Sequence, residues 1–186
     1  MPKKATKQTA FTLLKADHDK VKKLFDKFEK ETESSKRDIA VEAIQELKIH
    51  AAIEEQVFYP ALRHEMDDEE GLMDEADEEH HVAKFLIAEL EQMQGDEDNW
   101  DAKFMVLAEN VRHHIKEEER EIFPKAKTTD IDFVALGEHL VEAKDRMMLA
   151  GPPVGAEETM VGQFGLRGDS PSKMAQQNFE PPLKVA

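Results

Sequence analysis

The 186-residue chain contains no cysteine, which excludes disulfides, zinc-thiolate sites and iron-sulfur clusters. It also lacks any run of about 18 apolar residues, so we expect no membrane-spanning helix. The first residues carry basic side chains but no apolar stretch long enough for a signal peptide. A cytoplasmic protein is therefore expected.

Helix-breaking residues are scarce in the first 150 residues, because five of the eight glycines and five of the eight prolines follow Ala150. Residues 1–150 are therefore expected to form one helical domain. Residues 151–186 form a Pro/Gly-rich C-terminal tail, which is expected to be irregular. The tail is expected either to be disordered or to lie over the domain through Phe164, Leu166 and Phe179.

Basic charge is also in short supply, since 25 Lys and Arg against 41 Asp and Glu give a net charge of -16. Nearly all of this negative charge lies in residues 1–150. Such a surface repels nucleic acid and anionic lipid, so we expect neither as a partner. The sequence leaves the oligomeric state open between monomer and dimer.

Apolar residues recur at intervals of three and four, which predicts helices rather than strands. The expected helices cover about residues 9–32, 36–65, 67–93, 99–127 and 130–149. Pro60 is expected to kink the second helix or change its course, and Pro124 lies in the last turn of the fourth. The pattern predicts an all-α fold, an antiparallel up-down four-helix bundle with a short fifth helix.

Each long helix carries one histidine on its apolar stripe. The first stripe, for example, is apolar at every position except that of the histidine. The second and fourth stripes add a glutamate one turn after the histidine. Counting the helical rise from the connecting turns places the four histidines at similar heights, so six side chains are expected to meet in one layer. These candidate metal ligands are His18, His50, Glu54, His80, His114 and Glu118.

The other histidines are not candidates for this layer. His81 and His113 share their helix faces with charged residues and are expected at the surface. His139 lies off the apolar stripe of its helix and is also expected to be exposed. His64 follows Pro60, where the helical phase is not defined, and is left unassigned.

Six polar side chains on apolar stripes favour metal binding over a hydrogen-bonded polar core. Two buried, ionised glutamates without a cation would cost several kcal/mol each. Imidazole and carboxylate ligands without thiolate suit iron, manganese or zinc better than calcium or magnesium. Six ligands are too many for one tetrahedral zinc but suit two six-coordinate ions. We expect Glu54 and Glu118 each to bridge the two ions, two histidines to bind each ion, and an oxo or hydroxo group to complete the bridge. Each ion would then keep one position for an exogenous molecule.

The candidate ligands come from a duplicated pattern. The stretches "HAAIEEQVFYP", from His50, and "HIKEEEREIFP", from His114, share the H-x-x-x-E spacing and end in a proline. With His18 and His80 they form the order His, H-x-x-x-E, His, H-x-x-x-E. In this order, residues 9–127 resemble the hemerythrin-like family, often called the HHE cation-binding domain. The resemblance implies a four-helix bundle with a non-heme di-iron centre that reacts with O2 or a related small molecule.

One position departs from the oxygen-carrying members of that family. Hemerythrins have a fifth histidine one turn after the third-helix ligand, where this chain has Lys84. The lysine is expected to extend to solvent, with a hydrogen bond near the site as the alternative. Tyr59 is expected to be a packing residue, unless a change of helical course brings it near a metal.

Loss of the fifth histidine would leave both irons free to take exogenous ligands. This favours peroxide or NO chemistry, or sensing, over reversible O2 carriage. Some hemerythrin-like proteins with this ligand pattern resemble catalases, and this resemblance implies catalase-like peroxide handling in oxidative stress, which is the leading hypothesis. The alternatives are a protein that binds or senses O2, NO or iron without turnover, and a metal-free scaffold.

Overall fold

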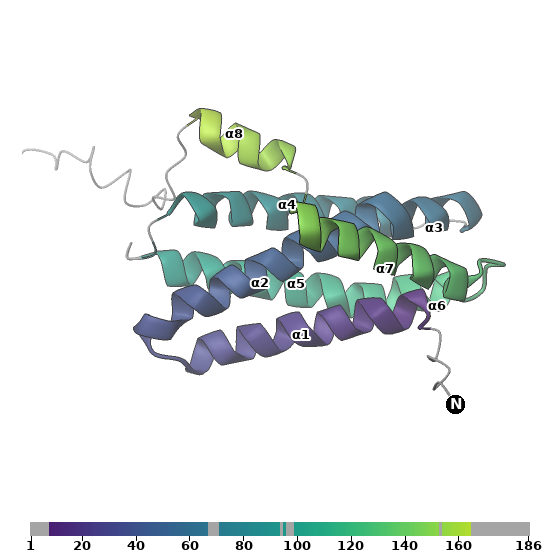
Figure 1. Cartoon of the computed structure of the whole chain (residues 1–186), viewed down its shortest axis with the longest axis horizontal. Coiled ribbons are helices and arrows are strands. Elements are labelled where there is room, and N and C mark those ends of the chain that lie inside the picture. The colour runs from purple at the N-terminus through teal and green to yellow at the C-terminus, as the bar shows by residue number, and fades with distance from the viewer. Residues whose placement is uncertain (1–7, 67–70, 94, 96–98, 153, 165–186) are drawn as a thin grey trace, which may run out of the picture.

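The computed structural model describes residues 8–66, 71–93, 95, 99–152 and 154–164, and the regular structure in these ranges is entirely helical. Four long helices lie side by side as an antiparallel bundle (Figure 1). They are α1 (Ala10–Lys30), α2 (Glu33–Ile53), α4 (Leu72–Gln92) and α5 (Trp100–Glu117). The all-α bundle predicted from the sequence is confirmed.

Local signals set where the helices begin. Thr9 caps α1, and its hydroxyl oxygen accepts a hydrogen bond from the N–H of Thr12 at 3.3 Å. This bond satisfies one of the amide groups that have no partner in the first turn. Lys27 and Lys30 in the last turn oppose the negative end of the helix dipole.

The second and fourth bundle helices each continue through a short π-helix. These segments are η1 (Glu54–Phe58) and η2 (Glu118–Ile122). Short α-helical pieces follow them, α3 (Tyr59–Glu65) and α6 (Phe123–Ala126).

The two prolines explain why both helices widen at these points. A proline has no N–H, and its ring clashes with the carbonyl four residues earlier in a regular α-helix. In η1 the N–H of Tyr59, just before Pro60, bonds to the carbonyl of Glu54 five residues back, and Phe123 bonds to Glu118 in the same way in η2. The change of course expected at Pro60 therefore takes the form of a π-helix that precedes the proline.

Two further helices cover the bundle. Helix α7 (Phe133–Ala150) packs on α1 and α2, and α8 (Ala156–Phe164) lies on α4 (Figure 1). A Cβ atom at Gly137 would lie 2.6 Å from the carbonyl oxygen of Gln8, so only glycine lets α7 approach the start of α1 this closely.

Helix α8 corrects the prediction of an irregular tail. Residues 156–164 are helical, although the sequence around them, "GPPVGAEETMVGQF", is rich in helix breakers. Leu166 and Phe179, which were expected to hold the tail on the domain, lie outside the described residues.

A polar layer divides the core into two apolar clusters. One is built around Phe123 and its neighbours, and the other around Phe104. On α1, Leu14 belongs to the first cluster and Val21 to the second, with the buried His18 between them. The other five candidate ligands are also buried, between the same two clusters.

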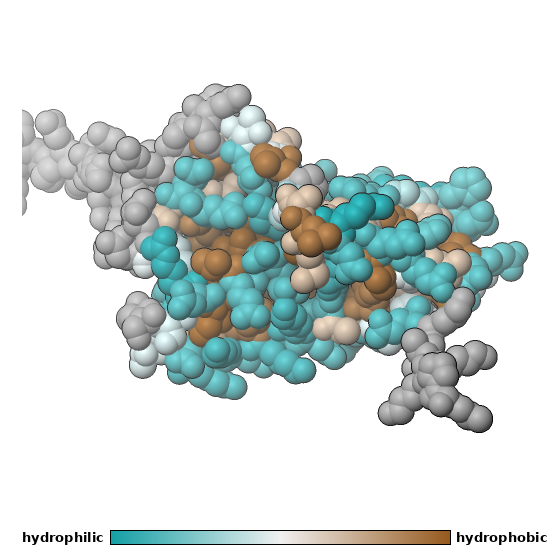
Figure 2. Space-filling model, in the orientation of Figure 1, coloured by the Kyte–Doolittle hydropathy of each residue, from teal (hydrophilic) through white to brown (hydrophobic). Residues whose placement is uncertain are grey.

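The surface of the bundle is mostly hydrophilic on the face shown in Figure 2, with smaller hydrophobic patches between the polar side chains. Within the described ranges, every helix is too short or too polar to cross a membrane.

Candidate metal centre

All six candidate ligands lie in one buried layer. Their exposed fractions do not exceed 6%, and both glutamates are fully buried. The ligand atoms form two groups, each within the reach of one ion. The first group contains His18, His50, Glu54 and Glu118, and the second contains Glu54, His80 and His114.

The distances show how the two groups are joined. The Nε2 atoms of His18 and His50 lie 3.1 Å apart, and those of His80 and His114 are also 3.1 Å apart. Glu54 belongs to both groups, because its Oε1 lies 3.1 Å from His50 Nε2 and its Oε2 lies 3.4 Å from His80 Nε2. The four histidines therefore form two pairs, one in each group, and Glu54 lies between the two pairs.

The second glutamate makes the arrangement less symmetric than the sequence repeat predicts. Glu118 Oε2 lies 3.1 Å from His18 Nε2, and this carboxylate belongs to the first group. Both glutamates were expected to bridge. The first group thus has four protein ligands and the second has three.

The buried carboxylate oxygens fit a bound cation. Within the described residues, neither oxygen of Glu54 or Glu118 has a hydrogen-bond partner. Two ligand atoms about 2.1 Å from one ion, at a right angle, would be about 3.0 Å apart, close to the separations found here. An ionised carboxylate without a partner in such a place would cost several kcal/mol. The cluster is therefore a cation-binding arrangement.

Each of the four imidazoles turns its other ring nitrogen towards a carboxylate. The Nδ1 distances are 3.0 Å from His18 to Glu119, 3.7 Å from His50 to Asp17, 3.0 Å from His80 to Glu55 and 2.8 Å from His114 to Glu79. An ionised carboxylate only accepts hydrogen bonds, so in His18, His80 and His114 the Nδ1 atom carries the proton and Nε2 presents its lone pair to the centre of the layer. The 3.7 Å between His50 Nδ1 and Asp17 Oδ2 is too long for a hydrogen bond, and neither atom has a hydrogen-bond partner within the described residues. Three of the four rings are thus held by a carboxylate in the orientation that metal binding through Nε2 requires.

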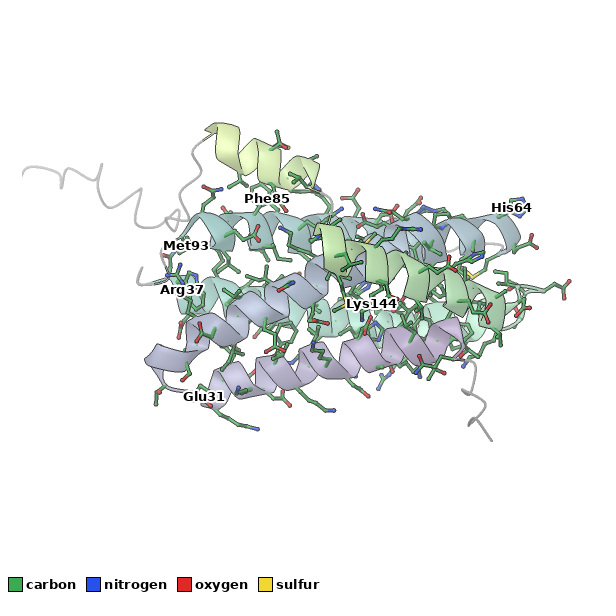
Figure 3. The ribbon with its side chains drawn as sticks, viewed as in Figure 1. Glu31, Arg37, His64, Phe85, Met93 and Lys144 are labelled. Carbon is green, nitrogen blue, oxygen red and sulfur yellow. The ribbon has the colours of Figure 1, made fainter. Side chains whose placement is uncertain are left out.

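These outer carboxylates are held in turn by basic side chains. Asp17 pairs with Lys144 of α7, and Glu119 lies 3.6 Å from Lys15 and from Lys22. Figure 3 shows Lys144 near the middle of the bundle. Glu79 lies 3.6 Å from Nε2 of the exposed His113.

Lys84 belongs to the same outer layer, contrary to the expectation that it extends to solvent. Its Nζ lies 3.0 Å from Oε1 and 3.2 Å from Oε2 of Glu55, the partner of His80. The alternative reading, a hydrogen bond near the site, is the one that the structure shows. The short distance along α4 from His80 to Lys84 lets both side chains reach the same carboxylate.

Sequence reasoning missed these outer carboxylates, although the sequence repeats them. Asp17 and Glu79 directly precede the first and third candidate histidines, and Glu55 and Glu119 directly follow the two candidate glutamates. The duplicated pattern is therefore longer than H-x-x-x-E. In a chain with 41 acidic residues, single acids next to a ligand resemble an ordinary solvated surface.

The comparison with protein families agrees with this geometry. Residues 9–126 match the family described as the hemerythrin HHE cation binding domain. The chain belongs to this family. The fold of this HHE domain is also found in the crystal structure of an HHE cation binding domain-containing protein of Mycobacterium kansasii, an Rv2633c homologue. That structure has a TM-score of 0.66 and 24% identity, with 77% of this chain and 89% of that chain covered. No curated protein gives a significant match.

Tyr59 reaches the centre of the HHE domain, although it was expected to be a packing residue. Its hydroxyl lies 3.5 Å from Nε2 of His114, and its ring centroid lies 5.5 Å from that of His80. The π-helix explains the error, because one extra residue in a turn rotates the following residues by about 100°. Assigning helix faces by intervals of three and four residues through η1 therefore places Tyr59 on the wrong side of the helix.

Burial and the charges of Glu54 and Glu118 raise the pKa of Tyr59 well above its usual value. The phenol consequently keeps its proton at neutral pH. The HHE domain thus places one protonated, buried hydroxyl next to the second ligand group.

Protons and metal ions compete for the same ligand atoms of the HHE domain. Burial lowers the pKa of His50, but the charge of Glu54 and the contact with Asp17 outweigh it and raise this pKa to about 10. Burial opposes the charged form of His80 too, yet Glu54 and Glu55 raise its pKa to about 9. The pKa of Glu54 falls well below its usual value, because the charges of His50 and His80 outweigh the effect of burial. Without a metal, the cluster therefore holds protons that a metal must displace.

A small cavity lies beside the four imidazoles. The centre of a water molecule can occupy ≈ 30 Å³ of it. Apolar side chains of the Phe104 cluster line the other side, including Leu47, Ile87 and Val111. Tyr59 belongs to the opposite cluster, so the cavity and the phenol lie on the two sides of the polar layer.

The remaining histidines are at the surface, as expected. The exposed fractions of their side chains are 53% for His81 and 56% for His113, and His139 is also exposed. His64, unassigned from the sequence, is 83% exposed at the outer end of α3 (Figure 3).

Proposed function

We propose that this HHE domain is a non-heme di-iron protein that acts on O2, H2O2 or NO, with the disproportionation of peroxide as its main reaction. His18, His50 and Glu118 would hold one ion, His80 and His114 the other, and Glu54 would bind both. A bound iron pair supplies a redox couple and coordination positions for a small molecule. Manganese fits the same donors, whereas zinc has no redox chemistry.

The observation that carries the proposal is the incomplete ligand set of the second group. It has three protein ligands, and Lys84, at the position of the fifth histidine of hemerythrins, is bound to Glu55 instead. A six-coordinate ion there has room for exogenous ligands. Reaction of a small molecule at this group is therefore favoured over simple carriage.

The size of the cavity favours small molecules. A site for one water molecule requires about 10–15 Å³ by the same measure, so ≈ 30 Å³ is room for about two water molecules. Dioxygen, NO and hydrogen peroxide are of this size, whereas organic substrates are larger. The apolar wall also suits uncharged molecules better than ions.

Tyr59 supports the enzymatic version of the proposal. Peroxide chemistry moves protons, and a positioned acid or base commonly contributes to such reactions. The Tyr59 oxygen holds a proton 3.5 Å from His114 Nε2. Conversion of two H2O2 into O2 and two H2O balances without another reductant, so the reaction requires no electron-transfer partner.

The test is to load the purified protein with iron and measure its metal content, its visible spectrum and O2 evolution from peroxide. We expect peroxide-dependent O2 evolution that is lost in His80→Ala. His139→Ala is the matched control, because it makes the same change in an exposed residue of α7. An iron-loaded protein that produces no O2 would contradict the enzyme version.

Binding or sensing of O2, NO or iron is the second candidate function. It is favoured by the contacts that join the two outer helices to the ligand layer, Lys144 of α7 with Asp17 and Glu157 of α8 with Lys84. A sensor requires such a connection between its ligand and an outer element. A reversible spectral change of the reduced protein in the gas, without turnover, would support this function.

A further inference from the structure

Helix α8 is attached to two bundle helices by buried or half-buried charges. Glu157 is 5% exposed, and its Oε1 lies 2.8 Å from His81 Nδ1 and 3.7 Å from Lys84 Nζ, both on α4. Glu158 pairs at 2.6 Å with Lys48 of α2. The first turn of α8 therefore spans the space between α2 and α4.

Lys84 connects this attachment to the metal centre. Its Nζ lies between Glu157 of α8 and Glu55 of η1, and Glu55 Oε1 lies 3.0 Å from Nδ1 of His80. Helix α8 is thus three contacts away from a candidate ligand.

A cleft in which the centre of a water molecule can occupy ≈ 320 Å³ lies beneath the start of α8. Its floor is formed by α2 and α4, and residues 154–158 form its outer side. Three of its lining residues, Ala51, Lys84 and Ile87, also line the cavity beside the imidazoles. These three side chains are therefore the partition between the metal cavity and the cleft.

Lys84 is the long, flexible member of this partition, and its position depends on its two glutamate partners. A helix of nine residues is too short to be stable by itself, since isolated helices below about 12–15 residues are marginal in water. Val161, 1% exposed, supplies an apolar anchor for α8, while Thr159 and Met160 are exposed. Helix α8 is therefore held in place by its contacts with the bundle, mainly with α4.

We propose that α8 is a latched cover over the route by which small molecules reach the metal cavity, and that Glu157 is the latch that holds both α8 and Lys84 in the closed position. That α8 covers a route to the metal cavity rests on the proposed function. That α8 opens when Glu157 is changed does not rest on it, because this movement requires neither a metal nor a substrate.

Opening of α8 can be measured without any metal, because the chain has no cysteine. A thiol introduced by Val161→Cys would lie under α8, and one introduced by Met160→Cys would lie on its outer side, where the residue is 45% exposed. We expect Glu157→Gln to speed the labelling of the buried thiol by about tenfold or more, because it removes a buried charged hydrogen bond. Labelling of the exposed thiol should not change. Glu109→Gln, an exposed glutamate of α5, is the control and should alter neither rate. An unchanged rate at position 161 would overturn the latch.

The route is tested with azide on the iron-loaded protein by stopped-flow absorption. If α8 covers the route, Glu157→Gln raises the association and dissociation rate constants by the same factor and leaves the dissociation constant unchanged. A rise in the association rate alone would indicate loss of negative charge near an anion, and would contradict the cover. Unchanged rate constants together with faster labelling at position 161 would show that α8 opens but does not lie on the route. Failure to bind iron would refute the proposed function, while the labelling result would still decide the latch.

Discussion

The imidazoles of His80 and His114 face each other with their Nε2 atoms 3.1 Å apart, and the Nδ1 atom of each ring lies within 3.0 Å of a carboxylate. Without a metal, the raised pKa of His80 keeps a proton on this pair of rings. When a metal displaces that proton, the remaining protons are on Nδ1 and both Nε2 lone pairs face the centre of the layer, where a cation would accept them. The Nε2 atoms of His18 and His50 have the same separation of 3.1 Å.

The outer carboxylates should tune the affinity for metal. Glu79→Gln weakens the acceptor that orients His114, and we expect the affinity for iron to fall about 10- to 100-fold. Competition with a chelator measures this change. Glu78→Gln is the matched control, because Glu78 is the exposed neighbour on the same helix. Equal affinities of the two variants would show that the carboxylate does not act through the histidine.

The hydroxyl of Tyr59 should matter for turnover more than for folding. Tyr59→Phe keeps the ring that packs near His80 and removes the protonated oxygen near His114. We expect iron content to stay the same and the kcat for peroxide to fall about 100-fold or more. A kcat equal to that of the unchanged protein would leave the phenol with a packing role alone.

Removal of the metal should destabilise the fold. The buried carboxylates of Glu54 and Glu118 have no hydrogen-bond partner within the described residues. A cation bound between them stabilises the native state and not the unfolded state, in which these side chains are no longer close together. Free iron at 100 times its dissociation constant would add about 2.7 kcal/mol to the free energy of unfolding. Denaturant unfolding with and without iron measures the difference. No gain in stability with iron would contradict metal binding in this layer.

The ion pairs of Glu157 should make stability depend on pH. Burial raises the pKa of this carboxyl. The hydrogen bonds from its own backbone N–H and from His81, together with the charge of Lys84, lower the pKa by a larger amount, so the net pKa is below the usual 4.5. A lowered folded-state pKa contributes stability above pH 4.5 that is lost as the pH falls through the folded-state value. The difference in unfolding free energy between the unchanged protein and Glu157→Gln should therefore be largest near neutral pH and vanish in acid. A difference that stays constant would exclude this ion pair as its cause.

The sequence predicted the bundle and the six candidate ligands because both depend on regular helical spacing. His18 and His80 lie in uninterrupted α-helix, where stepping by threes and fours keeps the correct phase. Tyr59 lies just beyond a π-helix, and the same stepping placed it on the wrong face. The phase error begins where the backbone ceases to be a regular α-helix.

The other errors concern residues whose partners are distant in the sequence. Lys84 has a long side chain whose direction is decided by Glu55 and Glu157, and neither contact follows from a local pattern. Helix α8 is short, lies among glycines and prolines, and is held by α4. Local composition predicts such a segment poorly, because tertiary contacts decide its structure.

We expect the layer of four histidines and two glutamates to hold a pair of iron ions. Elemental analysis of the iron-reconstituted protein tests it most directly, together with the same analysis of Glu54→Ala, which removes the carboxylate shared by both ligand groups. We predict close to two irons per unchanged chain and a clear loss of iron in the variant. Iron absent from the unchanged chain, or bound equally by the variant, would contradict it.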